Sequence, residues 1–267
     1  MLYLYPKNFS YDNSMKIFND YRSVFIYAYL FYLPVCQILE SLKLVSNGYI
    51  SRRTVKHIGF VWNVGLSLFS LVGTYFTLPF LIKCLMNDGL DSVLRLDNPY
   101  CDYKYVPSVS FWCTLFVLSK IPELFDTFLY IVKNEKQHIF LHWYHHLFTG
   151  VYAYMSGIIG NLPSHLGLWM TSLNFFVHTF MYGYYAIMEI TGPECWLRKL
   201  AMKNASFITT IQTVQMIIMM FIFIYDKYYI GHNFDHFGFG MYLVYAVLFS
   251  KLFIEKYFKN FKILKLD

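Results

Sequence analysis

Long apolar runs with few charges recur along this chain of 267 residues, and they constrain its fold more than any other feature. A helix of about 20 apolar residues crosses the hydrocarbon core of a bilayer, which is roughly 30 Å thick. Seven such runs lie at residues 23–42, 58–81, 108–132, 138–158, 164–188, 204–225 and 237–257. Backbone polar groups find no water in lipid, so the runs predict an all-α, polytopic membrane protein with about seven transmembrane helices, forming a single domain over residues 1–267.

The charge content excludes an ordinary soluble protein. Only 14% of the residues are charged, against roughly 25% in soluble domains, and 57% are hydrophobic. So few charges cannot cover a surface that faces water on all sides. The net charge of +6 is assigned to the loops between the runs, because no dense basic run with RNA-binding aromatics is present. No nucleic-acid partner is therefore expected.

Neither the cysteines nor the N-terminal segment shows the pattern of a disulfide framework, a metal site or a signal peptide. The five cysteines are scattered and form no CxxC pair, so no disulfide framework and no metal site are expected. Residues 1–22 lack a short apolar core followed by a cleavage site. We therefore expect no removable signal peptide, and the first apolar run is predicted to act as an uncleaved anchor.

The distribution of Lys and Arg predicts the orientation in the membrane. When the segments between the runs are assigned to alternate sides, seven of these residues lie on the side of the N-terminus and fourteen on the other. The richer side is expected to be cytoplasmic. The N-terminus is then lumenal and the C-terminus cytosolic.

Four of the apolar runs contain polar residues, which are costly in lipid and need a partner or a function. The four clusters are Lys120, Glu123, Asp126 and Thr127; His142, His145 and His146, with Gln137 before them; Asn174, His178, Tyr182 and Tyr185; and Thr209, Gln212 and Gln215.

The spacing of these residues places each cluster on one helical face. The three histidines fall at i, i+3 and i+4, and the other clusters also step by three or four. With the predicted orientation, all four clusters lie in the cytosolic half, within roughly 15 Å of the cytosolic end. A single amide is often only helix–helix glue, and Lys120–Glu123 alone could be a structural ion pair. Convergence at one depth on four helices favours a shared reactive pocket.

The clusters resemble the sequence boxes of a known family, the ELO fatty-acid elongases. Residues 120–127 resemble the KxxExxDT box, and residues 137–146 resemble the histidine box with its HxxHH pattern. Residues 174–185 are similar to the NxxxHxxMYxYY box and residues 209–215 to the TxxQxxQ box. Trp143 and Tyr144 inside the histidine box are similar to the branch that extends saturated and monounsaturated chains.

The resemblance implies an acyltransferase of the endoplasmic-reticulum membrane, a very-long-chain 3-oxoacyl-CoA synthase. Such an enzyme joins a long-chain acyl-CoA to malonyl-CoA with loss of CO2, in a tunnel that opens to the cytosol. It needs no cofactor and works with a ketoacyl reductase, a dehydratase and an enoyl reductase. This chain has no nucleotide-binding Gly motif for those later steps. A homo-oligomer is compatible with the sequence, and the C-terminus lacks the lysine pattern of a retrieval signal.

The reaction needs an acyl carrier, and imidazole is the good nucleophile left, because Cys113 and Cys195 lie outside the clusters. We expect His145 to attack the thioester and His178 to stabilise the enolate or oxyanion. His142 and His146 are expected to tune this pair, with Asp126 or Glu123 fixing their tautomers. Asn174, Tyr182 and Gln212 are expected to supply neutral hydrogen bonds. The residues predicted to bind the CoA phosphates at the cytosolic mouth are Lys133, Lys136, Arg198, Lys199 and Lys203.

Two other classes of protein remain open at this point. A membrane di-iron desaturase or hydroxylase also uses HxxHH but needs about eight imidazoles, and four of the nine histidines here are dispersed: His57, His165, His232 and His236. A seven-helix receptor or transporter would place polar residues at mid-depth or on the lumenal face. The acyl chain length is not readable, although Met220, Phe223 and Tyr242 are candidate stops at the lumenal end.

Overall fold

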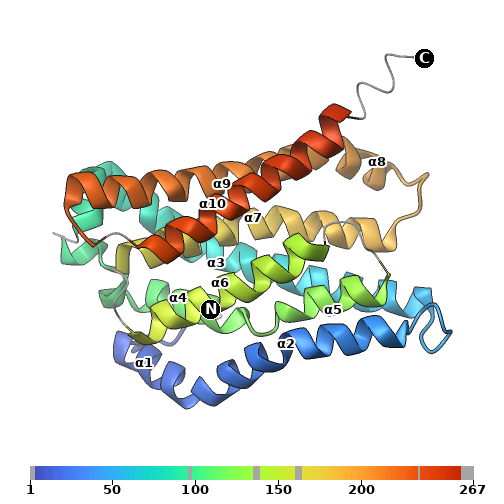
Figure 1. Ribbon diagram of the computed structural model, residues 1–267. Coiled ribbons are helices and arrows are strands. Elements are labelled where there is room, and N and C mark those ends of the chain that lie inside the picture. The colour runs from blue at the N-terminus through green and yellow to red at the C-terminus, as the bar shows by residue number, and fades with distance from the viewer. Residues whose placement is uncertain (1–3, 96–97, 135–138, 160–163, 234, 260–267) are drawn as a thin grey trace.

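The structure is a computed structural model that describes residues 4–95, 98–134, 139–159, 164–233 and 235–259 (Figure 1). Every regular element in this part of the chain is helical, which confirms the predicted all-α class. The α-helices are α1 (Tyr11–Asp20), α2 (Arg22–Leu42), α3 (Arg52–Arg95), α4 (Pro107–Ser119), α5 (Leu124–Val132), α6 (Ile139–Ile159), α7 (Ser164–Ile190), α8 (Trp196–Lys203), α9 (Ala205–Tyr225) and α10 (His236–Phe253). Short 3-10 and π segments are η1 (Pro99–Cys101), η2 (Tyr103–Tyr105), η3 (Asp226–Ile230) and η4 (Ile254–Lys259).

The long helices run side by side and form one elongated bundle (Figure 1). Contacts between neighbours are made by α3 with α7, α7 with α9, α9 with α10, α10 with α6, and α6 with α4 and α5. Helix α2 lies along the outside against α5 and α6. The short helix α8 marks one end of the bundle, which we call the α8 end (Figure 1).

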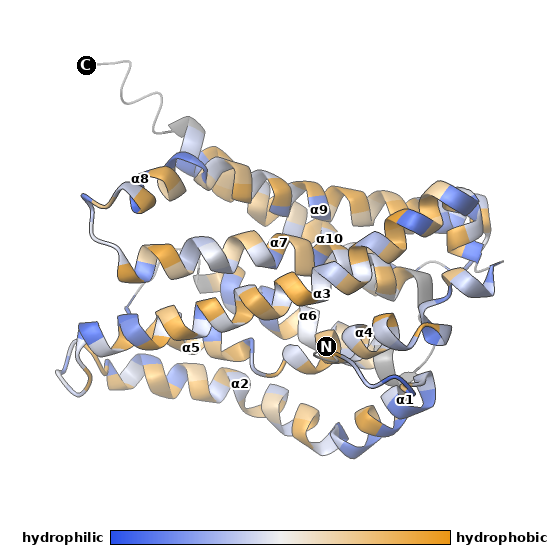
Figure 2. Ribbon diagram, turned by 180° about the vertical axis from the view of Figure 1, so that it is seen from behind, coloured by the Kyte–Doolittle hydropathy of each residue, from blue (hydrophilic) through white to orange (hydrophobic). Residues whose placement is uncertain are grey.

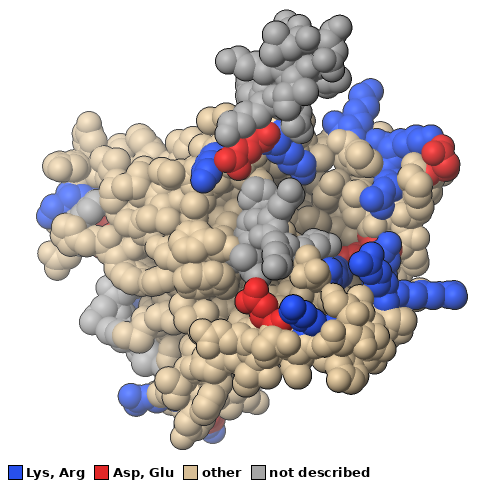
Figure 3. Space-filling model, turned by 45° about the vertical axis from the view of Figure 1, so that its right-hand side comes forward, with Lys and Arg blue, Asp and Glu red and all other residues tan. Residues whose placement is uncertain are grey.

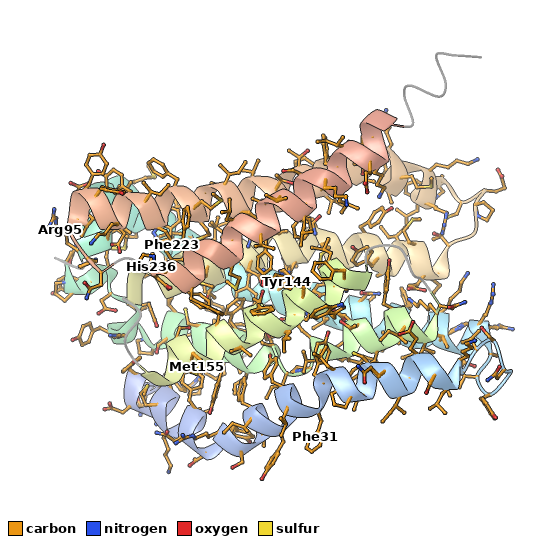
Figure 4. The ribbon with its side chains drawn as sticks, viewed as in Figure 1. Phe31, Arg95, Tyr144, Met155, Phe223 and His236 are labelled. Carbon is orange, nitrogen blue, oxygen red and sulfur yellow. A yellow bond between two sulfur atoms is a disulfide. The ribbon has the colours of Figure 1, made fainter. Side chains whose placement is uncertain are left out.

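Four stretches in the described residues are long and apolar enough to cross a membrane: Arg22–Leu42, Arg52–Arg95, Trp196–Ile230 and His236–Tyr257. They correspond to the first, second, sixth and seventh predicted spans. The exposed faces carry large apolar side chains, as on α2, where Leu30 and Phe31 are 62% and 55% exposed. Phe31 points away from the bundle in Figure 4, and Figure 2 shows apolar residues along the helix surfaces. The chain is therefore a membrane protein, while seven spans and an acyl tunnel stay predictions.

The third predicted span differs from the expectation of one continuous helix. The chain forms two helices there, α4 and α5, separated by a turn at residues 120–123. The physical reason is Pro122, which has no N–H to donate and clashes with the preceding turn of a helix. Tyr29 on α2 donates a hydrogen bond from its hydroxyl to the backbone carbonyl of Lys120, at 3.1 Å. The break thus exposes a carbonyl that a neighbouring helix uses.

Helices α3 and α7 pack closely along much of their length. The close approach depends on Gly73, because a Cβ atom built there would lie 2.5 Å from the ring of Phe175. The same helix α3 bends at Gly89, whose φ of 75° is readily reached by glycine. Beyond this bend, Val93 and Leu94 turn back into the core.

A disulfide joins Cys84 on α3 to Cys101 in η1, which corrects the expectation that the cysteines form no disulfide. The turn after Gly89 brings the chain back on itself, so two cysteines 17 residues apart meet. The C-terminal part of α3, which carries Cys84, lies at the opposite end of the bundle from α8 (Figure 1), and we call this opposite end the disulfide end. Arg95, Phe223 and His236 also lie toward that end in Figure 4.

The disulfide half of the bundle interior is filled by aromatic and methionine side chains. Met219, Phe223, Tyr242 and Tyr245 are each at most 4% exposed and belong to one continuous core cluster. The rings of Phe223 and Tyr242 lie 5.9 Å apart, between α9 and α10. Tyr152 on α6 joins them and donates a hydrogen bond from its hydroxyl to Asp235, at 2.5 Å. Two of the three candidate chain-length stops, Phe223 and Tyr242, are therefore fully packed.

Candidate active site

A cavity of about 540 Å³ lies in the α8 half of the bundle, between helices α3, α5, α6, α7, α9 and α10. Most of the polar residues predicted to share a pocket line it: Asp126, His142, His145, His146, Asn174, His178, Tyr182, Tyr185, Thr209, Gln212 and Gln215. Four helices far apart in sequence thus bring their polar faces to one space. Lys120, Glu123 and Thr127 lie beside this cavity but do not line it.

The three histidines of α6 form one layer of the cavity wall. The rings of His142 and His146 lie 5.6 Å apart, one turn along the same face. His145 stands at 89° to His146 with 5.4 Å between the ring centres. On its other side His145 contacts the ring of Tyr245 on α10, at 4.8 Å. The Tyr245 hydroxyl also lies 3.2 Å from the backbone carbonyl of His145 and 2.9 Å from the Thr149 hydroxyl.

Asp126 is the carboxylate that lies beside the histidines of the cavity, and two strong donors hold it. The hydroxyl of Tyr182 donates to one oxygen at 2.6 Å, and the indole N–H of Trp62 donates to the other at 2.5 Å. Nε2 of His146 lies 3.8 Å from the Asp126 carboxylate, which is too long for a hydrogen bond. Asp126 therefore does not fix the tautomer of His146 by a direct hydrogen bond, which corrects the expectation for that ring.

Trp62 and its neighbour Asn63 on α3 were not among the predicted site residues. Both line the cavity, and Asn63 is buried. The only sequence signal for them was one amide in the second apolar run, which matches no helical stripe. The indole N–H of Trp62 has no such signal, because a tryptophan in an apolar span is equally consistent with packing.

Lys120 is buried in a hydrogen-bond network that connects it to residues of the cavity wall. Its Nζ lies 2.8 Å from both carboxylate oxygens of Glu123 and 3.1 Å from Oδ1 of Asn174. Ser119 adds a hydrogen bond from its hydroxyl to Glu123, at 2.7 Å. The amide of Asn174 continues to Nε2 of His178, at 3.2 Å. Both oxygens of Glu123 thus accept from Lys120, and one also accepts from Ser119, while a role of Glu123 in fixing a histidine tautomer stays a prediction.

The amides of α9 close the remaining wall. Gln212 lines the cavity and donates from its amide to the sulfur of Met181, at 3.1 Å. Thr209 and Gln215 are buried beside it, and Thr209 donates its hydroxyl to the backbone carbonyl of Ala205. These groups are neutral, so this wall offers hydrogen bonds without charge.

Cationic side chains surround the mouth of the cavity, at the α8 end. Figure 3, which brings this end forward, shows Lys and Arg gathered there. The cations that line the cavity are Lys56, Lys133, Arg198 and Lys256.

Of the residues predicted to bind CoA phosphates at the mouth, Lys133 and Arg198 line the cavity. Lys133 forms an ion pair with Glu189, and this pair packs against the backbone of α3 at Gly59. A Cβ at Gly59 would lie 3.1 Å from a Glu189 oxygen, so the close fit favours glycine. Arg198 donates to the carbonyls of Met188 and Thr191 at the C-terminal end of α7, where the helix dipole favours a cation.

Lys199 and Lys203 do not line the cavity, contrary to the expectation of a continuous basic mouth. The Lys199 side chain is 60% exposed and pairs with Glu194. The reason is that α8 lies at the end of the bundle, so only part of its circumference can face inward. Lys136 and Gln137, two further predicted residues, lie outside the described residues.

The remaining described histidines do not add metal ligands to the cavity. His57 bonds the backbone carbonyl of Arg53 at the start of α3, and His232 bonds Asp226 in η3. His236 lies toward the disulfide end (Figure 4). Among the described side chains the cavity therefore holds four imidazoles, half of what the di-iron alternative needs.

Comparison with known proteins agrees with the sequence boxes. Residues 17–263 match the family model described as ELO: GNS1/SUR4 family. "Fatty acid elongase 3" of Trypanosoma brucei brucei is 34% identical over 74% of this chain and 72% of its own length. "Very long chain fatty acid elongase 4" of Trypanosoma cruzi is 30% identical over 95% of this chain and 88% of its own. "Long chain fatty acid elongase 2" of Caenorhabditis elegans is 36% identical over 75% and 72%. No solved structure matches the chain.

Proposed function

The chain belongs to the ELO family, and from this membership we propose that it is the condensing enzyme of fatty-acid elongation. Its substrates are a long-chain acyl-CoA and malonyl-CoA, and its products are a 3-oxoacyl-CoA, CoA and CO2. The relatives that cover most of its length are named as fatty acid elongases, which supports this reaction. The finer assignment is a very-long-chain 3-oxoacyl-CoA synthase that needs no cofactor.

The observation that carries the proposal is the convergence of four histidines and two carboxylates, Asp126 and Glu189, on a single cavity inside a membrane bundle. A protein that only packs helices has no need to gather costly polar groups around empty space. A cavity with several titratable groups and a cationic mouth fits a substrate that joins an apolar chain to phosphates.

In the first half-reaction the lone pair of a His145 ring nitrogen attacks the thioester carbonyl carbon. The carbon–sulfur bond breaks, the CoA thiolate leaves, and the ring proton passes to that thiolate. The acyl group is then held as an acyl-imidazole. His145 suits this role because no protein group within the described residues hydrogen-bonds its ring nitrogens.

In the second half-reaction malonyl-CoA loses CO2, and the electron pair of the broken carbon–carbon bond forms an enolate. The enolate carbon attacks the acyl carbon and the bond to His145 breaks. The ring nitrogen keeps the electron pair of that bond and takes up one proton from the medium, which restores the neutral imidazole. His178 donates to the negative oxygen that develops during this step. The cations at the mouth, Lys56, Lys133, Arg198 and Lys256, hold the phosphates of CoA.

The proposed location is the endoplasmic-reticulum membrane, with the N-terminus lumenal and the α8 end facing the cytosol. The disulfide supports this orientation, because it lies at the end assigned to the lumen, and disulfides persist in oxidising compartments. CoA esters would then enter from the cytosol, where the mouth is cationic. A ketoacyl reductase, a dehydratase and an enoyl reductase complete the cycle.

The test is malonyl-CoA-dependent extension of labelled acyl-CoA by the purified full chain, with mass spectrometry of the protein after acyl-CoA alone. We expect His145→Ala to lose the covalent acyl adduct and to lower elongation by about 10⁴-fold, since a nucleophile is removed. His57→Ala is the matched control, because its ring lies outside the cavity. Elongation by wild type without malonyl-CoA, or an undiminished adduct in His145→Ala, would contradict the proposal.

A further inference from the structure

The side chain of Asn174 lies between a buried ammonium group and a catalytic imidazole. Its Oδ1 is 3.1 Å from Nζ of Lys120, and its Nδ2 is 3.2 Å from Nε2 of His178. Asn174, His178 and Lys120 are all buried, with exposed fractions of 6%, 5% and 3%. The three groups form a chain that runs from Glu123 to the cavity wall.

The ammonium group decides which way round the Asn174 amide sits. A lysine ammonium group has three donors and no acceptor, so only the oxygen of an amide can face it. The opposite orientation would set an NH2 group against the ammonium. Glu123 holds Lys120 in place through both carboxylate oxygens, and the ring of Phe116 lies 4.1 Å from Nζ. The amide NH2 therefore has to point toward His178.

The amide in turn decides where the proton of His178 lies. An NH2 group that donates to Nε2 needs the lone pair of that nitrogen, so Nε2 is not protonated. The proton of the neutral ring is then on Nδ1. In the described part of the chain Nδ1 has no hydrogen-bond partner, and the His178 ring lines the cavity.

We propose that Lys120 and Asn174 are positioning residues that hold His178 as a hydrogen-bond donor, with its proton on Nδ1 and no lone pair for attack. This inference rests on the proposed function, because it assigns roles within that site. It separates the two central imidazoles: His178 donates to the developing oxyanion, and His145 is left as the nucleophile. It also gives Lys120 and Glu123 a role in the site although neither lines the cavity.

The direct test reads the ring proton itself. The full chain in detergent micelles is labelled with ¹⁵N-histidine, and the ring signals of His178 are assigned by their loss in His178→Gln. We expect wild type to show a protonated Nδ1 and an unprotonated Nε2. In Asn174→Asp the carboxylate can only accept, so the proton is expected on Nε2. A wild-type spectrum with the proton on Nε2, or on both nitrogens, overturns the inference.

The kinetic test separates the two half-reactions. Asn174→Asp should still form the acyl adduct on His145 at near the wild-type rate, but condensation with malonyl-CoA should fall by about 100-fold or more in kcat. Loss of adduct and condensation together in a folded Asn174→Asp protein would overturn the assignment. Thr179→Ser, on the same helix and outside the cavity lining, is the control for helix packing.

A third variant keeps the test informative if Asn174→Asp does not fold. Lys120→Met combined with Glu123→Met removes the ion pair without leaving a buried charge. It also removes the constraint on the amide, so we expect both tautomers of His178 in its spectrum. A single Nδ1-protonated form in this double variant would overturn the role of Lys120. Absence of elongation by wild type would instead defeat the proposed function and leave the tautomer measurement valid.

Discussion

The same helices surround an open polar cavity in one half of the bundle and a filled apolar core in the other half. On α6 the α8 half carries three histidines around a cavity, whereas the disulfide half carries Tyr152 in a filled core. On α9 the polar residues Gln212 and Gln215 give way two turns later to Phe223. Each of these two helices therefore lines the cavity in one half and packs into the core in the other.

The contrast teaches how a cavity can persist in a membrane bundle. Packing, and not water exclusion, holds helices together in lipid, so empty space weakens the contacts around it. The disulfide half fills its interior with large rings and fixes the helix spacing, and the Cys84–Cys101 bridge closes its surface loop. The α8 half can then keep its space open.

Asp126→Asn should lower kcat of elongation by about 100-fold. The amide offers one acceptor oxygen where the carboxylate offers two, so either Tyr182 or Trp62 loses its partner. Asp91→Asn is the matched change at the disulfide end, where Asp91 accepts from Tyr225 on the surface, and it should leave kcat unchanged. Steady-state extension assays on both variants make the comparison, and equal losses would break the proposed division.

Lys133→Met should raise KM for the CoA substrates by about tenfold while kcat changes little. One charge-assisted contact to phosphate contributes about 1.5–3 kcal/mol of binding free energy. Because solvent at the mouth screens the charge, we expect the lower value, which corresponds to a change of about tenfold in KM. Lys199→Met is the control, because Lys199 is exposed and lies away from the cavity. Initial rates over a range of acyl-CoA concentrations measure the effect. A fall in kcat without a change in KM would place Lys133 in the chemistry instead.

Tyr242→Ala should lengthen the product by a further two-carbon round while the first extension keeps its rate within a few fold. Removing the ring opens space in the filled half, beyond His145 and its neighbour Tyr245. Val247→Ala on the exposed face of α10 is the control. Gas chromatography of the acyl products gives the readout. An unchanged product pattern in a folded variant would mean that the acyl chain does not extend toward Tyr242.

Replacing Cys84 and Cys101 together by serine should leave the elongation rate at 25 °C unchanged and lower the melting temperature. A closed loop of this length contributes about 3 kcal/mol. For a protein of this size the corresponding shift is roughly 6–12 °C. Cys195→Ser, a free cysteine near α8, is the control. Thermal unfolding in detergent followed by fluorescence measures it, and a large loss of elongation at 25 °C would show that the two halves are not separable.

The sequence predicts the polar residues around the cavity better than it predicts the packed core of the disulfide half. His142, His145, His146, His178 and Asn174 were found because an ionisable or amide group in an apolar run stands out at helical spacing. The arrangement of these groups was harder to predict. Which atoms meet depends on the packing between helices. The sequence therefore predicts a contact from Asp126 to the histidines, whereas the carboxylate accepts hydrogen bonds from Tyr182 and Trp62.

Three features escaped prediction for physical reasons. A tryptophan in an apolar run is normally a packing residue, and only the structure shows that the Trp62 N–H donates to Asp126. The disulfide depends on the turn after Gly89, which brings distant cysteines together. The break between α4 and α5 did have a signal, because Pro122 lies inside the third apolar run, and a proline ends or kinks a helix. The length of the apolar run nevertheless predicts one continuous helix over residues 108–132, and this prediction is wrong.

The break also makes α5 a short lever. Asp126 near its start and Lys133 at its end are about 10 Å apart, two turns along one rigid rod. We expect a phosphate that draws Lys133 away from Glu189 to shift α5 slightly, and Asp126 with it. Trp62, bonded to Asp126, gives this motion a natural fluorescent reporter, to be read as the difference between wild type and Trp62→Phe on addition of CoA.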